Sequence, residues 1–139
     1  MNAPDFIRAA TACVGVKWRH QGRNPGIALD CIGLLIAAGE ACGYDFGEVP
    51  PYGREPLPGF LIGEIGKRAE RIEQWPPQAG DVLVLEFVQG KPQHMGIALS
   101  DDRLIHTSMS VRRVTIEPID ERWRQRIHSV WRLHGMEAA

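Results

Sequence analysis

The chain is short of cysteine, of long apolar runs and of net charge, and each shortage argues against a class of protein. Its 3 cysteines, Cys13, Cys31 and Cys42, are too few and too irregularly spaced among 139 residues for a disulfide framework. No apolar run approaches the roughly 18 residues of a membrane-spanning helix. With 16 basic and 17 acidic residues the net charge is −1, which argues against a nucleic-acid partner. We therefore expect a globular protein with at least one free thiol, no membrane span and no nucleic acid bound.

The N-terminal segment indicates whether the protein is exported, and the length indicates how many domains it has. The first ten residues, MNAPDFIRAA, lack the basic start and the apolar core of about 7–15 residues that a signal peptide has. We therefore expect a protein made in the cytoplasm and not exported by that route. The length fits a single domain over residues 1–139, which buries roughly two-thirds of its unfolded surface.

Hydrophobic periodicity predicts helices first and strands afterwards. Helices are expected at residues 4–13, at 31–42 with Gly43 closing the helix, at 60–73 and, in a short form, near 120–126. The segments 15–30 and 44–59 are turn-rich and are expected to be irregular. After Pro76 and Pro77 the period changes, and strands are expected at 82–88, 95–99, 103–108, 111–116 and 127–133. Helices followed by an antiparallel meander indicate an α+β fold.

Cys31 is the candidate nucleophile. It follows a turn-rich loop and begins a helical pattern, so its sulfur lies in the first turn of the expected helix. Free backbone N–H groups and the helix dipole stabilise a thiolate there, which predicts a low thiol pKa. Burial beside Ile32 and Leu34 acts in the opposite direction, so a reactive thiol also needs a base nearby. The alternative is a buried structural cysteine, which is our interpretation of Cys13 and Cys42.

His94 and His106 are the candidate partners of this thiol. His94 shares a strand face with the small residues Gly96 and Ala98, and His106 lies in the next expected strand. A hairpin with an odd-numbered loop places both imidazoles on one face, where one can take the thiol proton and the other can fix its tautomer. Alternatives remain open: each histidine can be a satisfied core or edge residue. Cys31, both histidines and a carboxylate can also bind a metal, although no CxxC or HExxH motif supports one.

The segments around these residues resemble the NlpC/P60 cysteine peptidases. The family motifs concerned are an Asp-Cys-Ser-Gly-Leu nucleophile motif, a Gly-Asp-Leu strand start, a His-Val-Gly-Ile-Tyr strand and an Ile-His-Ala strand. The matching segments here are Leu29-Asp30-Cys31-Ile32-Gly33-Leu34, Ala79-Gly80-Asp81-Val82-Leu83, His94-Met95-Gly96-Ile97-Ala98-Leu99 and Leu104-Ile105-His106-Thr107-Ser108. The resemblance implies a papain-like fold in which the nucleophile helix packs on an antiparallel sheet.

The same resemblance implies roles for individual residues. Cys31 is the implied nucleophile, His94 the general base and His106 the residue that orients it, with the Cys31 backbone N–H in the oxyanion hole. Three further positions are implied to contact substrate: Asp30, Trp18 and Ile32. Asp30 is expected to hold a substrate amine, whereas Trp18 replaces a family tyrosine and Ile32 replaces a family serine. Neither a cofactor nor a metal is implied.

The overall layout is similar to the phage-tail branch of this family. That branch has a Tyr-Arg-His-Gln-like segment, a Pro-Pro-Tyr stretch and a closing Trp-x-x-Arg-Ile run. The corresponding segments are Trp18-Arg19-His20-Gln21, Pro50-Pro51-Tyr52 and Trp123-Arg124-Gln125-Arg126-Ile127. The resemblance implies an endopeptidase of the virion tail that cleaves peptidoglycan stem peptides, at a γ-D-glutamyl-diamino acid bond, during wall penetration. Tail-tip or hub proteins are its expected partners.

Two other functions fit the same residues. The protein can be a structural tail-tip or hub subunit whose peptidase site is latent or vestigial, since Trp18 and Ile32 depart from the family pattern. It can also be a cytoplasmic amidase or acyltransferase that acts on a small peptide, because Cys–His sites support many acyl transfers.

Overall fold

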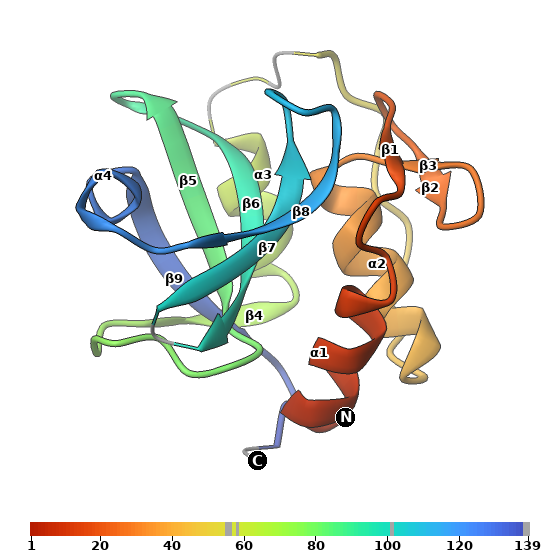
Figure 1. Cartoon of the computed structure of the whole chain (residues 1–139). Helices are drawn as coiled ribbons and strands as arrows, with labels where there is room; N and C mark the ends of the chain where they lie inside the picture. The colour runs from red at the N-terminus through yellow and green to blue at the C-terminus, as the bar shows by residue number, and fades with distance from the viewer. Residues whose placement is uncertain (55–56, 58, 101, 138–139) are drawn as a thin grey trace.

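The fold is built on a mixed sheet with three helices on one face and a short fourth helix on the other (Figure 1). The structure, a computed structural model, describes residues 1–54, 57, 59–100 and 102–137. They form a nine-stranded sheet with the order β2-β3-β1-β8-β7-β6-β5-β9-β4. Its central strands are β5 (Val82–Val88), β6 (Lys91–Ser100), β7 (Arg103–Ser108), β8 (Arg113–Pro118) and β9 (Ile127–Leu133). All neighbours among these five pair antiparallel, and β5 to β8 form the predicted meander.

The outer strands are short and extend the sheet at both edges. They are β1 (Lys17–Trp18), β2 (Arg23–Asn24), β3 (Ala28–Leu29) and β4 (Ala69–Ile72). The turn-rich segment 15–30 thus contains three two-residue strands, of which β1 joins the edge of β8. This edge carries the segment that leads into the helix that begins at Cys31.

The helices begin where short polar side chains cap them. The side chain of Asn2 caps α1 (Ala3–Thr11), that of Asp30 caps α2 (Cys31–Ala41) and that of Asp120 caps α4 (Glu121–Arg124). The remaining helix, α3 (Phe60–Gly66), has no side-chain cap. None of the helices in the described ranges has both the length and the apolar character that a membrane-crossing helix needs.

Two apolar clusters hold the layers together. The larger one lies between α1, α2 and α3 and one face of the sheet, and it includes Phe6, Leu34 and Ile105. The smaller one lies on the other face under α4, around Leu83 and Trp123. Because alternate residues of a strand point to opposite faces, the central strands are apolar on both sides. The α+β, papain-like arrangement, with α2 packed against β6 and β7, agrees with the prediction.

One predicted helix is wrong in its second half. The periodicity predicts a helix over 60–73, but α3 ends at Gly66 and residues Ala69–Ile72 form β4 instead. These residues pair antiparallel with β9, and Ala69 is buried against the core. Tertiary pairing thus overrides a local helical pattern. The segment 44–59 has no helix or strand among its described residues before Phe60, and residues 55, 56 and 58 lie outside the described part.

Candidate active site

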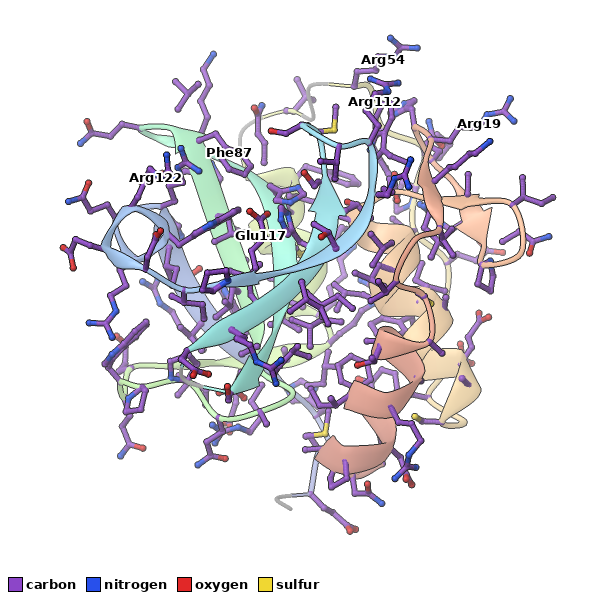
Figure 2. The ribbon with its side chains drawn as sticks, in the orientation of Figure 1. Arg19, Arg54, Phe87, Arg112, Glu117 and Arg122 are labelled. Atoms are coloured by element: carbon purple, nitrogen blue, oxygen red, sulfur yellow. The ribbon has the colours of Figure 1, made fainter. Side chains whose placement is uncertain are left out.

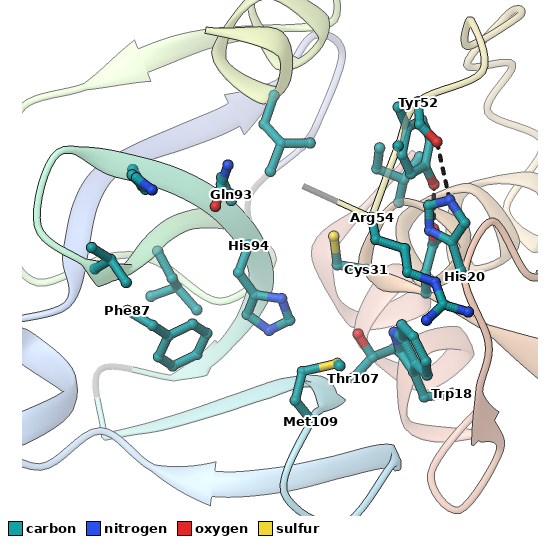
Figure 3. A pocket seen from close by; sticks show the side chains of 17 residues that line it. Trp18, His20, Cys31, Tyr52, Arg54, Phe87, Gln93, His94, Thr107 and Met109 are labelled. Atoms are coloured by element: carbon teal, nitrogen blue, oxygen red, sulfur yellow. Dashed lines mark hydrogen bonds between the residues drawn. The ribbon is translucent and has the colours of Figure 1, made fainter. Parts of the chain in front are cut away.

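Cys31 is the first residue of α2, as the sequence predicts, and it opens into a pocket beside the sheet (Figure 3). The pocket has a volume of about 210 Å³. Its walls come from the loop before α2, the segment around Tyr52, and strands β5, β6 and β7. The predicted residues among those that line it are Trp18, Asp30, Cys31, Ile32 and His94. The thiol and the His94 imidazole therefore share one cavity, although they are 63 positions apart in the numbering.

Asp30 fixes the start of the helix with a fully bonded carboxylate. Its Oδ1 accepts from the Gly33 N–H and from Arg23 Nη1, both at 2.8 Å. Its Oδ2 accepts from the Gln21 N–H at 2.9 Å and from the Tyr52 hydroxyl. The residue is 5% exposed, so these four donors occupy the carboxylate from within the chain. The contacts that Asp30 makes are structural; its predicted contact with a substrate amine stays a prediction.

A close backbone contact locks the same turn. A Cβ built on Gly33 would lie 1.9 Å from the backbone oxygen of Gly22, so only glycine fits at this point of α2. The loop over residues 19–24 therefore lies directly on the first turn of the helix. The position of the Cys31 thiol depends on this contact as well as on the Asp30 cap.

His94, His106 and Glu117 form a hydrogen-bonded chain on neighbouring strands. His94 Nε2 lies 2.9 Å from His106 Nδ1, and His106 Nε2 lies 2.5 Å from Glu117 Oε2. The register pairs Gly96 with His106, which makes the two histidines diagonal neighbours on one face, as predicted. Glu117 belongs to β8 and lines a hollow beside His106 together with Phe87 and Arg122 (Figure 2).

The donors in this chain assign a tautomer to each imidazole. An ionised carboxylate only accepts, so His106 Nε2–H donates to Glu117 and His106 Nδ1 is left as an acceptor. His94 Nε2–H then donates to that nitrogen, which leaves a lone pair on His94 Nδ1. A neutral imidazole in this tautomer is a base that can take a proton from a thiol in the pocket.

The pKa shifts describe a resting site that carries no charge on sulfur or imidazole. Burial raises the pKa of the Cys31 thiol to about 12, and the Asp30 carboxylate adds to the effect. The backbone N–H groups of Met95 and Ile32 act in the opposite direction but do not offset the burial. Burial also lowers the pKa of His94 to about 3, and a proton on His106 would lower it in the same direction. The expected low pKa of Cys31 is therefore wrong for the free protein, in which the thiol is the favoured form.

The two positions that depart from the family pattern both lie at the pocket. Trp18 is half-buried, and the guanidinium of Arg112 lies 4.9 Å from the centre of its ring. Ile32 is 5% exposed and packs in the larger core cluster. Each lines the cavity with apolar surface where the family pattern has a hydroxyl.

Two residues of the site were not among the predicted site residues. Glu117 extends the histidine pair, and Tyr52 donates its hydroxyl to Asp30. Burial and the Asp30 carboxylate raise the pKa of Tyr52, so its hydroxyl stays a donor. Tyr52 belongs to a segment singled out for its resemblance alone, and no local pattern marks Glu117. Within the described ranges, no three His, Cys, Asp or Glu side chains are grouped so as to hold a metal ion.

Comparisons with known proteins agree with this fold. A model of the NlpC/P60 family matches residues 15–132. An NLP/P60-family protein similar to a lipoprotein from Staphylococcus aureus superposes with a TM-score of 0.68 at 16% identity, over 94% of this chain and 41% of that one. The NlpC/p60 domain of the peptidoglycan hydrolase SagA gives 0.67 at 20% identity, over 94% and 97%. The peptidoglycan hydrolase RipB from Mycobacterium tuberculosis gives 0.65 at 20%, over 94% and 63%. A search of curated protein sequences found no match. Because the family model covers most of its length, the chain belongs to the NlpC/P60 family.

Proposed function

We propose that the protein is a cysteine endopeptidase that cleaves peptidoglycan stem peptides, at the bond between a γ-D-glutamyl residue and a diamino acid. The observation that carries this proposal is the chain from His94 through His106 to Glu117, which ends in the pocket that Cys31 lines. The substrate class is supported by the names of two structural neighbours, SagA and RipB, which are peptidoglycan hydrolases. The bond itself is proposed from the family resemblance.

The geometry suits acyl transfer through a thioester. Cys31 Sγ attacks the carbonyl carbon of the scissile amide while its proton moves to His94 Nδ1. The tetrahedral oxyanion accepts hydrogen bonds from backbone N–H groups at the start of α2, including that of Cys31. The imidazolium of His94 then donates its proton to the leaving amine, and the C–N bond breaks. In the second half, His94 takes a proton from water, which attacks the thioester and releases the acid and the thiol.

We also propose that this activity belongs to a phage tail, where the protein would act with tail-tip or hub proteins during wall penetration. The support lies in the three segments that resemble the phage-tail branch. His20 and Gln21 of the first segment lie 3.0 and 2.8 Å from the backbone oxygen of Tyr52 in the second. Trp123 of the third packs on the ring of His106. All three segments thus meet at the site. Mass spectrometry of purified particles is the test, and absence of the polypeptide from them removes the proposal.

Cys31→Ala is the test of the enzyme itself. We expect the wild-type protein to release soluble muropeptides from purified peptidoglycan, and the variant to release none above background. Cys42→Ala is the matched control, because Cys42 lies at the far end of the same helix, away from the pocket. A Cys31 variant as active as the wild type refutes the assignment of the nucleophile. Inactivity of both proteins on peptidoglycan and on stem peptides supports the alternative of a structural subunit with a vestigial site.

A further inference from the structure

Thr107 carries a polar group that the folded chain leaves unused. Among the described residues, its Oγ1 is the buried side-chain oxygen or nitrogen without a hydrogen-bond partner. Thr107 itself is 0% exposed and lies near the C-terminal end of β7, which runs between β6 and β8. Buried polar groups are nearly always hydrogen-bonded, because an unmade bond costs the full desolvation of the group. A buried hydroxyl without a hydrogen-bond partner in the free chain suggests that a bound ligand supplies the partner.

The position of Thr107 points to the pocket as the source of that partner. It follows His106 in β7, so its side chain lies on the opposite face, the one that Ile105 shares with the α2 side of the core. Thr107 lines the same pocket as Cys31 and Trp18. Figure 3 shows its hydroxyl oxygen directed towards the interior of that pocket, beside Trp18. The neighbouring Met109 is 51% exposed and unbranched, so an entering ligand can displace it.

The charges around the pocket indicate what kind of group Thr107 meets. Two exposed cations, Arg54 and Lys91, line the pocket. The carboxylate of Asp30 is already bonded to Arg23 and to three other donors. A ligand atom in this surrounding is favoured if it is an oxygen that accepts hydrogen bonds, such as a carbonyl or carboxylate, rather than an ammonium group.

We propose that Thr107 is a substrate-binding residue, whose Oγ1–H donates a hydrogen bond to an oxygen of the peptide's acyl portion when the substrate fills the pocket. The inference rests on the proposed endopeptidase function and assigns one contact within it. The Ile-His-Ala strand that this segment resembles has alanine at the same place, so the hydroxyl is a feature of this chain. The contact would give a partner to a buried donor that lowers the stability of the free protein.

Thr107→Val isolates the hydroxyl, because valine has nearly the same shape and no polar atom. Thr107→Ser keeps the hydroxyl and removes a methyl group, and Thr107→Ala serves as a second deletion if the valine variant does not fold. The substrate is a γ-D-glutamyl-diamino acid peptide, assayed for KM and kcat beside the wild type and Cys31→Ala. We expect the valine and alanine variants to raise KM about tenfold, the size of one lost hydrogen bond, with kcat little changed. The serine variant should stay within about threefold of the wild type.

Thermal unfolding separates this role from a structural one. Because the hydroxyl is unbonded in the free protein, Thr107→Val should melt at the same temperature as the wild type or higher. A valine variant with the KM of the wild type refutes the inference and leaves the proposed function intact. A serine variant that loses as much as the valine variant also refutes it, because packing and not the hydroxyl would then be responsible. Failure of the wild type itself to cleave the peptide refutes the proposed function first, and this inference with it.

Discussion

Two substitutions at Glu117 can separate the effect of its negative charge from its effect as a hydrogen-bond acceptor for His106. Glu117→Ala removes the carboxylate and leaves His106 Nε2 facing solvent. Glu117→Gln also removes the charge, but its amide can donate to His106 Nε2. In that case His106 carries its proton on Nδ1 and donates to His94 Nε2, so the proton of His94 moves to the nitrogen that must accept the thiol proton. We therefore expect the glutamine variant to be the less active of the two.

The size of each effect follows from the geometry. The two hydrogen bonds of 2.9 and 2.5 Å place the carboxylate near the imidazolium that forms on His94 during the reaction. At a separation of roughly 7 Å and an effective dielectric constant of about 20, the attraction is about 2 kcal/mol. The Glu117 side chain is 36% exposed, so solvent screening reduces this to about 1 kcal/mol, or about fivefold in kcat for the alanine variant. An inverted tautomer costs more, on the order of 10²–10⁴-fold, by analogy with the serine-protease triad.

The assay is the initial rate of cleavage of a γ-D-glutamyl-diamino acid peptide, with thermal unfolding as the check that both variants fold. Equal losses in the two variants would mean that the carboxylate acts only through its charge. Wild-type rates in both would refute a role for Glu117 in the reaction. Addition of salt offers an independent measurement, because the alanine effect depends on a partly exposed charge and should shrink as ionic strength rises.

Two further predictions concern stability. Gly33→Ala places a methyl group 1.9 Å from the Gly22 oxygen, so we expect a loss of about 3 kcal/mol in the free energy of unfolding, measured in urea. Gly63→Ala is its control, because open space surrounds that position of α3, and it should be neutral or stabilising; similar losses in both would contradict the packing argument. Burial lowers the pKa of His94 from 6.5 to about 3, so the unfolded chain takes up this proton first as the pH falls. Stability from this residue is therefore complete above about pH 6.5 and declines by about 1.4 kcal/mol per pH unit towards pH 3, and His94→Gln should flatten that decline. A variant with the same acid profile as the wild type would contradict the buried, neutral state of His94.

Cys31, His94 and His106 could be singled out from the sequence because the placement of each depends on a local pattern. Cys31 follows Asp30, a residue type that caps helices, and the apolar run after it marks the helix. His94 and His106 lie in alternating segments, and the two-residue period fixes which side chains share a face. The same period gives the diagonal pairing seen in the structure, once the register of one hairpin is known.

Glu117 could not be predicted from the sequence, because its contact with His106 depends on the register between β7 and β8. In β8, Thr115 pairs with His106 and Glu117 pairs with Leu104, so Glu117 is the diagonal neighbour of His106. A shift of one residue would turn its carboxylate to the other face of the sheet. The prediction of a helix over 60–73 was wrong after Gly66 for a similar reason. Ala69–Ile72 have a helical pattern locally, but their long-range pairing with β9 makes them a strand.

The hydroxyl groups around the pocket show how the departures from the family pattern bear on substrate recognition. Trp18 and Ile32 bring apolar surface where the family has a tyrosine and a serine. Tyr52, from a different segment, also places a phenolic hydroxyl at the pocket. That hydroxyl already donates a hydrogen bond to Asp30, the residue that caps α2. Of the hydroxyls that line the pocket in the described ranges, the one on Thr107 is left without a partner. The proposed contact of Thr107 would place a part of peptide recognition in strand β7, next to His106, rather than in the segments that flank Cys31 in sequence.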